Sequence, residues 1–502
     1  MLITLTAPAF AETWYIENGD ITVKASGTEG KNTVSQGNKK DVEDTNTIIT
    51  NQNQDKASSH TVTIDANDKN DKVEVTLKDV NIDTSSRNKA AVSVTGSGNT
   101  TIKLDGDNAL KSDTYRSGIY GSGSLTISGG ENDSLTAQGG SGANGISSSG
   151  SLTISGGTVT ANGGNGGYGI YSSGVTISGG TITANGGSGK DGSGDGIFSF
   201  DPVAISGGTV TAKGGSGEDG EDGGDGIRSF DPVAISGGTV TAKGGSGEDG
   251  SGGRGIISTK SVTISGGTVN ANGGSGKNGN GGNGIIGSGR VAISGGTVNA
   301  AGGDGGNGKD GGDGIRSGGI DLSGSLELTA KAGSPNGKAL SQNGKELDLN
   351  AIKDKLGPGA KVTVTDANGE TKQVSIPRPV EPEKPVIPEE SSSSSDGGSS
   401  APSAPASSLP GLTVTDKSGA VISYTSTQSG NTLTVCVGRL TASLRASLST
   451  LRQLRAEGIE TITFQTILCS TTLSVDELLA MGGEDAEAVL THRSTDSSLT
   501  VG

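Results

Sequence analysis

The decapeptide Val203-Ala-Ile-Ser-Gly-Gly-Thr-Val-Thr-Ala212 is one copy of a unit that recurs along the middle of the chain. Subtracting neighbouring positions gives steps of 23 to 30 residues between the Ile-Ser-Gly-Gly cores at Ile154, Ile177, Ile205, Ile235, Ile264 and Ile293, and a looser copy at Ile127. A motif that returns at this period is typical of a solenoid, in which each unit is stable only when stacked on its neighbours.

Each unit carries three short apolar runs separated by Gly-rich turns, as in Gly196-Ile-Phe198, Val203-Ala-Ile205 and Thr209-Val-Thr-Ala212. These runs are too short for helices. Alternation of Val210 with Thr209 and Thr211 puts the apolar side chain on one face of a short strand and the hydroxyls on the other. Three strands per unit, joined by glycines that can take positive φ, predict one coil of a parallel β-helix with a core of Ile, Val and Ala.

The composition agrees with a thin solenoid. The 502 residues include 91 glycines and only 2% aromatic residues, which is poor for one large globular core. Residues 199–220 and 229–250 are identical, as expected after duplication of one whole coil that stacks interchangeably with its neighbours. No stretch reaches the ~18 apolar residues of a membrane-spanning helix, so we expect no transmembrane segment.

The chain divides into six predicted segments. The first residues are apolar and end in small residues at Ala9 and Ala11, which predicts the tail of a secretory signal. We expect a signal-peptide remnant at 1–12, irregular N-terminal coils at 13–117, Gly-rich repeats at 118–335, a C-terminal β cap at 336–376, a Pro/Ser-rich linker at 377–410 and a small α+β domain at 411–502. Asn368-Gly369 predicts a hairpin within the cap.

The C-terminal domain is predicted from its own periodicity. Leucines at steps of 4, 4, 3 and 3 from Leu440 to Leu454 predict an amphipathic helix from Thr441 to Glu457. A strand should run from Thr461 to Leu468, and Ser474 with Glu477 forms a capping box that opens a second helix. Cys436 and Cys469 lie in predicted strands, where either one disulfide or two buried thiols would fit.

Acidic residues at recurring positions of the array indicate a cation site. The residue before the recurrent Gly-Ile is, in order, Asn144, Tyr168, Asp195, Asp225, Arg254, Asn283 and Asp313. Asp195 and Asp225 should stack on adjacent coils, where two carboxylates at ~4.8 Å repel. Calcium would relieve this repulsion, because it accepts flexible sets of carboxylate, carbonyl and water oxygens.

Four Gly-rich turns also match the Gly-Gly-x-Gly-x-Asp part of the calcium-binding nonapeptide repeat, and they end at Asp191, Asp219, Asp249 and Asp310. The match is local, since nonapeptides run in tandem whereas these turns recur once per coil. The alternative is that they are solvated turns whose charges keep a Gly-rich surface soluble.

The repeated Ile-Ser-Gly-Gly-Thr-Val-Thr-Ala and Asp-Gly-Ile motifs, preceded by Val75-Thr-Leu-Lys-Asp-Val-Asn-Ile82, resemble a family of secreted bacterial carbohydrate-binding-domain-containing proteins of clostridial type. The resemblance implies a right-handed parallel β-helix of the pectate-lyase kind, calcium, and binding of plant cell-wall or acidic polysaccharide such as polygalacturonate. By motif, the calcium ligands would be Asp195, Asp225 and Asp313, with Asn144 and Asn283 as neutral oxygen ligands, while Tyr168 and Arg254 interrupt the row.

Three functions fit these patterns. The first is a monomeric, secreted or cell-surface polysaccharide-binding protein, with Arg228, Arg316 and Tyr168 as candidate ligand contacts and calcium bridging an acidic chain to an acidic glycan. The second is a calcium-dependent polysaccharide lyase that uses Arg228 or Arg316 as its base. The alternative is that both arginines are surface residues that pair with nearby aspartates, because they belong to a repeat whereas a lyase site is a unique cluster. The third is a structural adhesin or stalk with no specific glycan. Nucleic acid is excluded as a partner, since a chain with a net charge of -16 has no basic stripe to neutralise phosphates.

Overall fold

The computed structural model describes residues 12–26, 30–190, 192–377, 412–416, 419–422, 424–429, 431–437, 441–466, 470–481, 486–493 and 496–501. The chain divides into two compact units, Met1–Glu383 and Lys384–Gly502. Residues 1–11 of the signal remnant predicted at 1–12, and nearly all of the predicted linker, lie outside the described residues.

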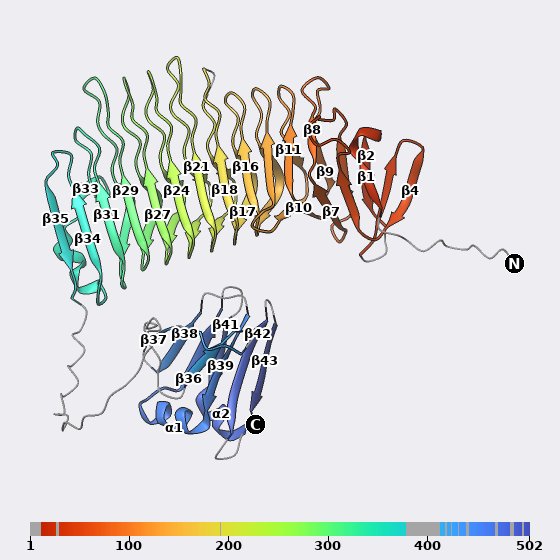
Figure 1. Cartoon of the computed structure of the whole chain (residues 1–502). Helices are drawn as coiled ribbons and strands as arrows, with labels where there is room; N and C mark the ends of the chain where they lie inside the picture. The colour runs from red at the N-terminus through yellow and green to blue at the C-terminus, as the bar shows by residue number, and fades with distance from the viewer. Residues whose placement is uncertain are drawn as a thin grey trace, which may run out of the picture. The chain divides into compact units, whose positions relative to one another are not determined.

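The first unit is a β-solenoid of about 13 turns (Figure 1). A regular coil contains three short strands, such as β19 (Ile197–Ser199), β20 (Val203–Ile205) and β21 (Thr209–Lys213), at the three predicted apolar runs. The first two strands of each coil belong to a 23-stranded sheet and the third to a 12-stranded sheet. The predicted parallel coil is therefore confirmed.

Strands of the 23-stranded sheet begin with those near the N-terminus: β1 (Thr13–Tyr15), β2 (Ile21–Ala25), β3 (Asn32–Gln36), β4 (Lys39–Asp44), β5 (Thr47–Thr50), β6 (Val62–Ala66), β7 (Lys72–Lys78), β9 (Val92–Gly96) and β10 (Asn99–Asp105). It continues with β12 (Ile119–Gly121), β13 (Ser124–Ser128), β15 (Ile146–Ile154), β17 (Ile170–Ile177), β19, β20, β22 (Ile227–Ser229), β23 (Val233–Ile235), β25 (Ile256–Ser258), β26 (Ser261–Ile264), β28 (Ile285–Ile293), β30 (Ile315–Leu322), β32 (Leu340–Gln342) and β33 (Lys345–Glu346).

The 12-stranded sheet contains β8 (Asn81–Asp83), β11 (Asp107–Lys111), β14 (Ser134–Gln138), β16 (Thr158–Asn162), β18 (Thr181–Asn185), β21, β24 (Thr239–Lys243), β27 (Thr268–Asn272), β29 (Thr297–Ala301), β31 (Glu327–Lys331), β34 (Lys361–Thr365) and β35 (Thr371–Ser375). Two 3-10 helices, η1 (Ile16–Asn18) and η2 (Leu349–Lys355), complete this unit.

Successive coils pair in register, so that each residue meets its counterpart. Val203 pairs with Val233, and Ile205 with Ile235. Along β21 burial alternates, with Val210 and Ala212 inside and the threonines outside. Each buried Val or Ile contributes roughly 1.5–3 kcal/mol. The core is therefore the column of Ile, Val and Ala that the sequence predicts.

Antiparallel strands lie at both ends of the solenoid. Near the N-terminus β2 pairs antiparallel with β3, and β3 with β4. At the other end β34 and β35 form an antiparallel hairpin around Asn368-Gly369, which confirms the predicted turn.

The Gly-rich turns form a hydrogen-bonded layer of their own. Figure 1 shows them as a row of loops projecting from one edge of the solenoid. The outgoing arm of one loop bonds to the returning arm of the previous coil: Gly215 N–H donates to Gly194 O at 2.8 Å, and Gly245 N–H donates to Gly224 O at 2.8 Å. The two arms of one loop also bond to each other, as Gly253 N–H does to Gly245 O at 2.8 Å. The sequence analysis treated these segments only as turns. At glycines such as Gly215, Gly224 and Gly245 the backbones pack so closely that a Cβ would collide with a backbone carbonyl of a neighbouring arm.

The second unit contains two four-stranded sheets and two short helices. One sheet is ordered β36 (Leu412–Thr415), β39 (Thr441–Ser447), β42 (Glu487–Arg493) and β43 (Asp496–Val501), and the other β37 (Thr425–Ser429), β38 (Thr432–Cys436), β40 (Thr461–Gln465) and β41 (Ser470–Ser474). The helices are α1 (Leu448–Ala456) and α2 (Val475–Met481). Glu477 N–H donates to Ser474 Oγ, as the predicted capping box requires.

The predicted helix from Thr441 to Glu457 is wrong in its first half. Residues 441–447 form strand β39, in which Ala442, Leu444 and Ala446 are buried alternately and which pairs with both β36 and β42. Ser447 then caps α1 by accepting the Thr450 N–H at 3.2 Å. Leu444 fits both periods, so tertiary pairing decided between them. Cys436 ends β38, whereas Cys469 lies outside the described residues, so the disulfide stays a prediction.

The Gly layer predicts a large difference between two Gly→Ala substitutions. A Cβ at Gly245 would collide with the backbone carbonyl of Gly215, whereas at Gly319 the nearest heavy atom is 3.8 Å away. We expect Gly245→Ala to lower the free energy of unfolding by about 1–3 kcal/mol. Gly319→Ala, the matched control, should leave it nearly unchanged. Denaturant unfolding of both variants measures the difference, and equal midpoints would contradict a close-packed layer.

Candidate functional site

Two columns of side chains run along one flank of the solenoid. The inner column is the residue before the recurrent Gly-Ile, and the outer column is the residue after that Ile. Parallel register and backbone hydrogen bonds align each column from coil to coil. The inner column holds Asn144, Tyr168, Asp195, Asp225, Arg254, Asn283, Asp313 and Lys338; the outer column holds Tyr120, Ser147, Tyr171, Phe198, Arg228, Ile257, Ile286, Arg316 and Ser341.

The Asp and Asn side chains of the inner column accept hydrogen bonds from backbone N–H groups. In every case one side-chain oxygen accepts the backbone N–H of the next residue in the column. The bonds are Tyr168 N to Asn144 Oδ1 (2.9 Å), Asp225 N to Asp195 Oδ1 (2.6 Å), Arg254 N to Asp225 Oδ1 (2.7 Å), Asp313 N to Asn283 Oδ1 (2.6 Å) and Lys338 N to Asp313 Oδ1 (2.8 Å). Asp and Asn serve equally here, because each offers an oxygen at the right place.

Asp195 and Asp225 form a buried acidic pair on adjacent coils, 4% and 1% exposed. Burial, followed by the charge of Asp225, raises the pKa of Asp195 to about 7, against the opposing N–H of Asp225. Burial also raises the pKa of Asp225, opposed by Arg254 and Arg228. The guanidinium groups of both arginines lie 3.5 Å from the Asp225 carboxylate.

These buried acids do not fit a calcium site. Calcium takes six to eight oxygen ligands, yet Asp195, Asp225 and Asp313 are each nine-tenths or more buried and each uses one oxygen on a backbone N–H. Within the described part of the chain, no group of three or more His, Cys, Asp or Glu side chains is placed to hold a metal.

The acids of the Gly-rich loops that were predicted as calcium ligands lie apart from this pair and interact with side chains of neighbouring loops. Asp219 lies 3.1 Å from Lys190 Nζ, Asp249 accepts from Asn278 Nδ2 at 2.5 Å, and Asp310 accepts from Asn336 Nδ2 at 2.8 Å. Asp191 lies outside the described residues.

Five aromatic side chains gather beside the acidic pair. Tyr168, Tyr171, Phe198, Phe200 and Phe230 make ring contacts with centroids 4.9–5.7 Å apart, and we call them the aromatic cluster. Phe200 and Phe230 stack on each other and are 44% and 38% exposed. The Arg228 guanidinium lies 6.0 Å from the Phe198 ring and 5.7 Å from the Phe230 ring. The cluster is an apolar platform with a cation at its edge.

From the sequence, only Tyr168 of this cluster is predicted as a ligand contact. The signal was present in the repeat: Tyr171 and Phe198 hold the same column position, and Phe200 and Phe230 recur in the duplicated coil. Burial, then the charge of Asp195, raises the pKa of Tyr168. Arg228 lies 3.5 Å from Asp225, as expected if the arginine pairs with a nearby aspartate and does not act as a catalytic base.

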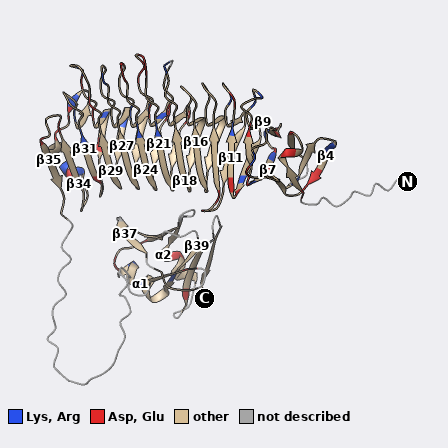
Figure 2. Cartoon of the chain, turned by 45° about the horizontal axis from the view of Figure 1, so that its top comes forward, with Lys and Arg blue, Asp and Glu red and all other residues tan. Residues whose placement is uncertain are grey.

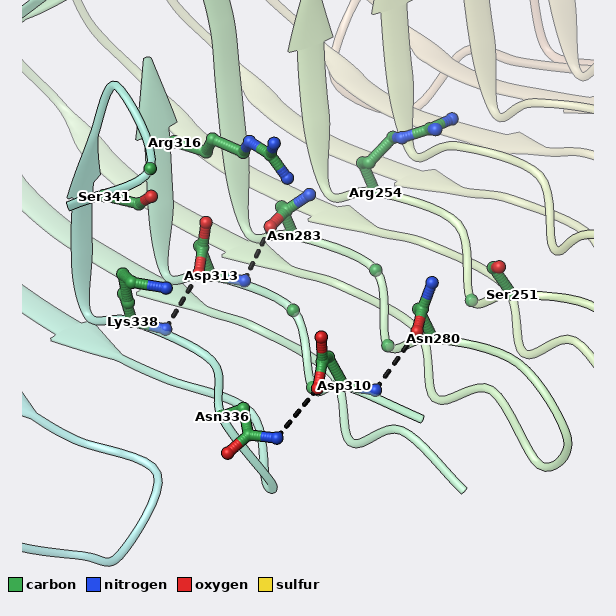
Figure 3. Close-up of a pocket in the computed structure, with 16 residues that line it drawn as sticks. Ser251, Arg254, Asn280, Asn283, Asp310, Asp313, Arg316, Asn336, Lys338 and Ser341 are labelled. Carbon is green, nitrogen blue, oxygen red and sulfur yellow. Dashed lines mark hydrogen bonds between the residues drawn. The ribbon is translucent and has the colours of Figure 1, made fainter. Parts of the chain in front are cut away.

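A polar hollow of about 320 Å³ follows on the same flank, beyond Arg254 (Figure 3). It brings together four of the residues predicted from the sequence as metal or ligand contacts: Asn283, Asp310, Asp313 and Arg316. Figure 3 shows Asp313 hydrogen bonded between Asn283 and Lys338, and Asp310 between Asn280 and Asn336. In Figure 2 most of each strand in the array is tan, the colour of residues other than Lys, Arg, Asp and Glu.

Comparison with protein families gives one match. The model described as carbohydrate-binding domain-containing protein matches residues 55–311, which are 257 of the 502 residues. The match covers the aromatic cluster and the acidic pair. No curated protein and no solved structure matches the chain. In the described part of the chain no helix is long and apolar enough to cross a membrane.

The acidic pair makes stability depend on pH. Because the pKa of Asp195 rises from 3.8 to about 7 on folding, the folded state holds its proton more tightly, and stability falls as pH rises from about 4 to about 7. The loss amounts to at most about 4 kcal/mol. Asp195→Asn keeps the oxygen that accepts the Asp225 N–H, as Asn144 and Asn283 do, and should abolish most of this fall. Melting curves from pH 4 to pH 8 test it, with Asp249→Asn as the control; an unchanged pH profile in Asp195→Asn would contradict the assignment.

Proposed function

The chain belongs to the carbohydrate-binding domain-containing proteins, and from this premise we propose that it binds an acidic polysaccharide along the flank that carries the aromatic cluster. The observation that carries the proposal is the cluster itself: five rings in mutual contact, two of them well exposed, inside the family-matched segment. Ligand sites are built mostly from apolar and aromatic groups with a few fixed polar groups.

The aromatic cluster offers a sugar two kinds of contact. The exposed faces and edges of Phe200 and Phe230 can pack against the C–H face of a pyranose ring. Tyr168 and Tyr171 are half-buried in the same cluster, and Tyr168 supplies a phenolic hydroxyl that can donate or accept a hydrogen bond.

Arg228 favours an acidic sugar over a neutral one. Its side chain is 38% exposed, and its approach to Asp225 is 3.5 Å, so most of its five N–H donors remain available. A guanidinium binds a carboxylate through two parallel hydrogen bonds, and a uronic acid carries that group on each ring. The overall charge of -16 opposes a polyanion at long range, but salt screens this repulsion beyond about 8 Å.

Removing the two exposed rings should weaken binding to polygalacturonate. We expect the double variant Phe200→Ala, Phe230→Ala to lose about tenfold or more in affinity, since each ring contributes on the order of 1 kcal/mol. Affinity electrophoresis in polygalacturonate gels measures the retardation. The control is Tyr15→Ala, which removes a partly exposed ring of β1 far from the cluster.

Two results would overturn the proposal. One is equal retardation of the cluster variant and the wild type. The other is no retardation of the wild type by polygalacturonate, by a neutral glycan or by any member of a glycan array, which would favour the structural stalk instead.

Calcium dependence is the part of the proposal that rests on the sequence patterns. Its favoured candidate ligands are the exposed loop acids, because each column acid is buried and gives one of its oxygens to a backbone N–H. We expect calorimetric titration with CaCl₂ to give heats that Asp249→Asn and Asp310→Asn remove, and a chelator to reduce retention on polygalacturonate. Equal retention with and without chelator would separate calcium from glycan binding.

The proposal also includes a right-handed winding, secretion to the bacterial surface and a monomeric state. Right-handed crossovers between parallel strands of one sheet are the strong general preference, which supports the first. The second rests on the apolar start of the chain. Plant cell-wall material is the proposed source of the glycan.

A further inference from the structure

A second hollow with exposed aromatic rings lies nearer the N-terminus, at coils that precede the aromatic cluster. Its volume is about 650 Å³, and its lining includes Tyr115, Tyr120, Arg116, Asn88 and Asn144. We call it the tyrosine hollow. Tyr115 is 76% exposed and Tyr120 46% exposed. Neither ring contributes much to the core.

Tyr115 stands where other coils have glycine. Its N–H donates to Ser141 O, just as Gly142 donates to Asn165 O and Gly166 to Ser188 O. All three residues have positive φ, at 60°, 73° and 70°. A bulky residue in this conformation is an outlier that costs roughly 1–2 kcal/mol. The exposed ring recovers little of that cost by burial, and such strain clusters at functional sites.

The ring of Tyr115 nevertheless has a defined support. A Cβ at Gly142 would lie 2.7 Å from Tyr115 Cε1, so the absence of a side chain on Gly142 leaves room for the ring to lie against the next coil. The ring therefore lies on the surface over Gly142 of the next coil.

The tyrosine hollow belongs to the same flank as the aromatic cluster. Tyr120 pairs in register with Ser147, Ser147 with Tyr171, and Tyr171 with Phe198. Tyr120 and Tyr171 thus occupy the outer column two coils apart, or about 10 Å at ~4.8 Å per coil. The outer-column residue between them is Ser147, whose small side chain lines the hollow.

The hollow repeats the chemistry of the cluster. Arg116 is exposed, donates its Nε–H to Asn88 Oδ1 at 3.0 Å and lines the hollow together with the two tyrosines. A ring next to a guanidinium is also what Phe230 and Arg228 provide. One ligand with repeated sugar rings and repeated carboxylates could bind at both the tyrosine hollow and the aromatic cluster.

We propose that the tyrosine hollow is a second subsite for the same acidic polysaccharide, whose chain lies lengthwise along the solenoid and spans both the hollow and the aromatic cluster. This inference rests on the proposed function. Two subsites on one rigid surface make the second contact intramolecular, so affinity should rise steeply once a chain is long enough to reach from one to the other.

Oligogalacturonides of defined length, from about two to about ten sugar units, test the inference by calorimetry. For the wild type we expect long chains to bind roughly tenfold or more tightly than short ones. Tyr115→Ala, Tyr120→Ala should bind short chains as the wild type does and lose the gain for long chains. Phe200→Ala, Phe230→Ala should weaken binding at every length.

Tyr115→Gly is the second variant, and it separates binding from folding. Glycine adopts positive φ without strain, so this variant should melt no lower than the wild type, yet it should lose part of the long-chain gain. Long-chain affinity unchanged in both hollow variants overturns the second subsite and leaves the proposed function intact. No binding of any length by the wild type overturns both.

Discussion

In-register hydrogen bonding between successive coils is the constraint on which the rest of this solenoid depends. Each strand obtains its backbone partners from the coils on either side, so every residue lies about one strand spacing from the residue at the same position of the next coil. Val203 faces Val233 and Tyr171 faces Phe198 for this one reason. A substituted side chain therefore contacts the side chains at the same position of the two neighbouring coils. Side chains of one chemical type at one position form a column along the solenoid.

The Gly-rich loops obey the same constraint through backbone hydrogen bonds at their glycines. Their outgoing and returning arms bond alternately, as Gly215, Gly224 and Gly245 do, and the backbones approach too closely for a Cβ. Glycine is thus required for packing here as well as for turning. This explains how a chain with 91 glycines and few aromatic residues forms an ordered structure, since the layer satisfies backbone groups that a flexible loop would leave to water.

Column stacking also explains the acidic pair. An Asp or Asn in the inner column supplies an acceptor for the next N–H, and this need is met whichever of the two residues is present. Where two aspartates fall on adjacent coils, burial raises both pKa values, and the arginines that follow them offset part of the cost. The coils of Asp195 and Asp225 also carry three of the five rings of the aromatic cluster, and two of these, Phe200 and Phe230, lie at matching positions of the identical segments 199–220 and 229–250.

The sequence by itself determined the coil, because a motif with a fixed period, three apolar runs and Gly-rich turns has only one way to bury its Ile, Val and Ala residues. It also placed Asp195 and Asp225 on adjacent coils and found the closing hairpin at Asn368-Gly369. It could not decide that Thr441 to Ser447 is a strand, because Leu444 fits both periods and only pairing with β36 and β42 selects one. It assigned the column acids to a cation, whereas the structure gives one oxygen of each to a backbone N–H of the next coil. Only the tertiary structure brought five rings from three coils into contact and set Tyr115 beside the same flank, because the depth of each side chain and the path of each loop depend on neighbours that lie a whole coil away in the sequence.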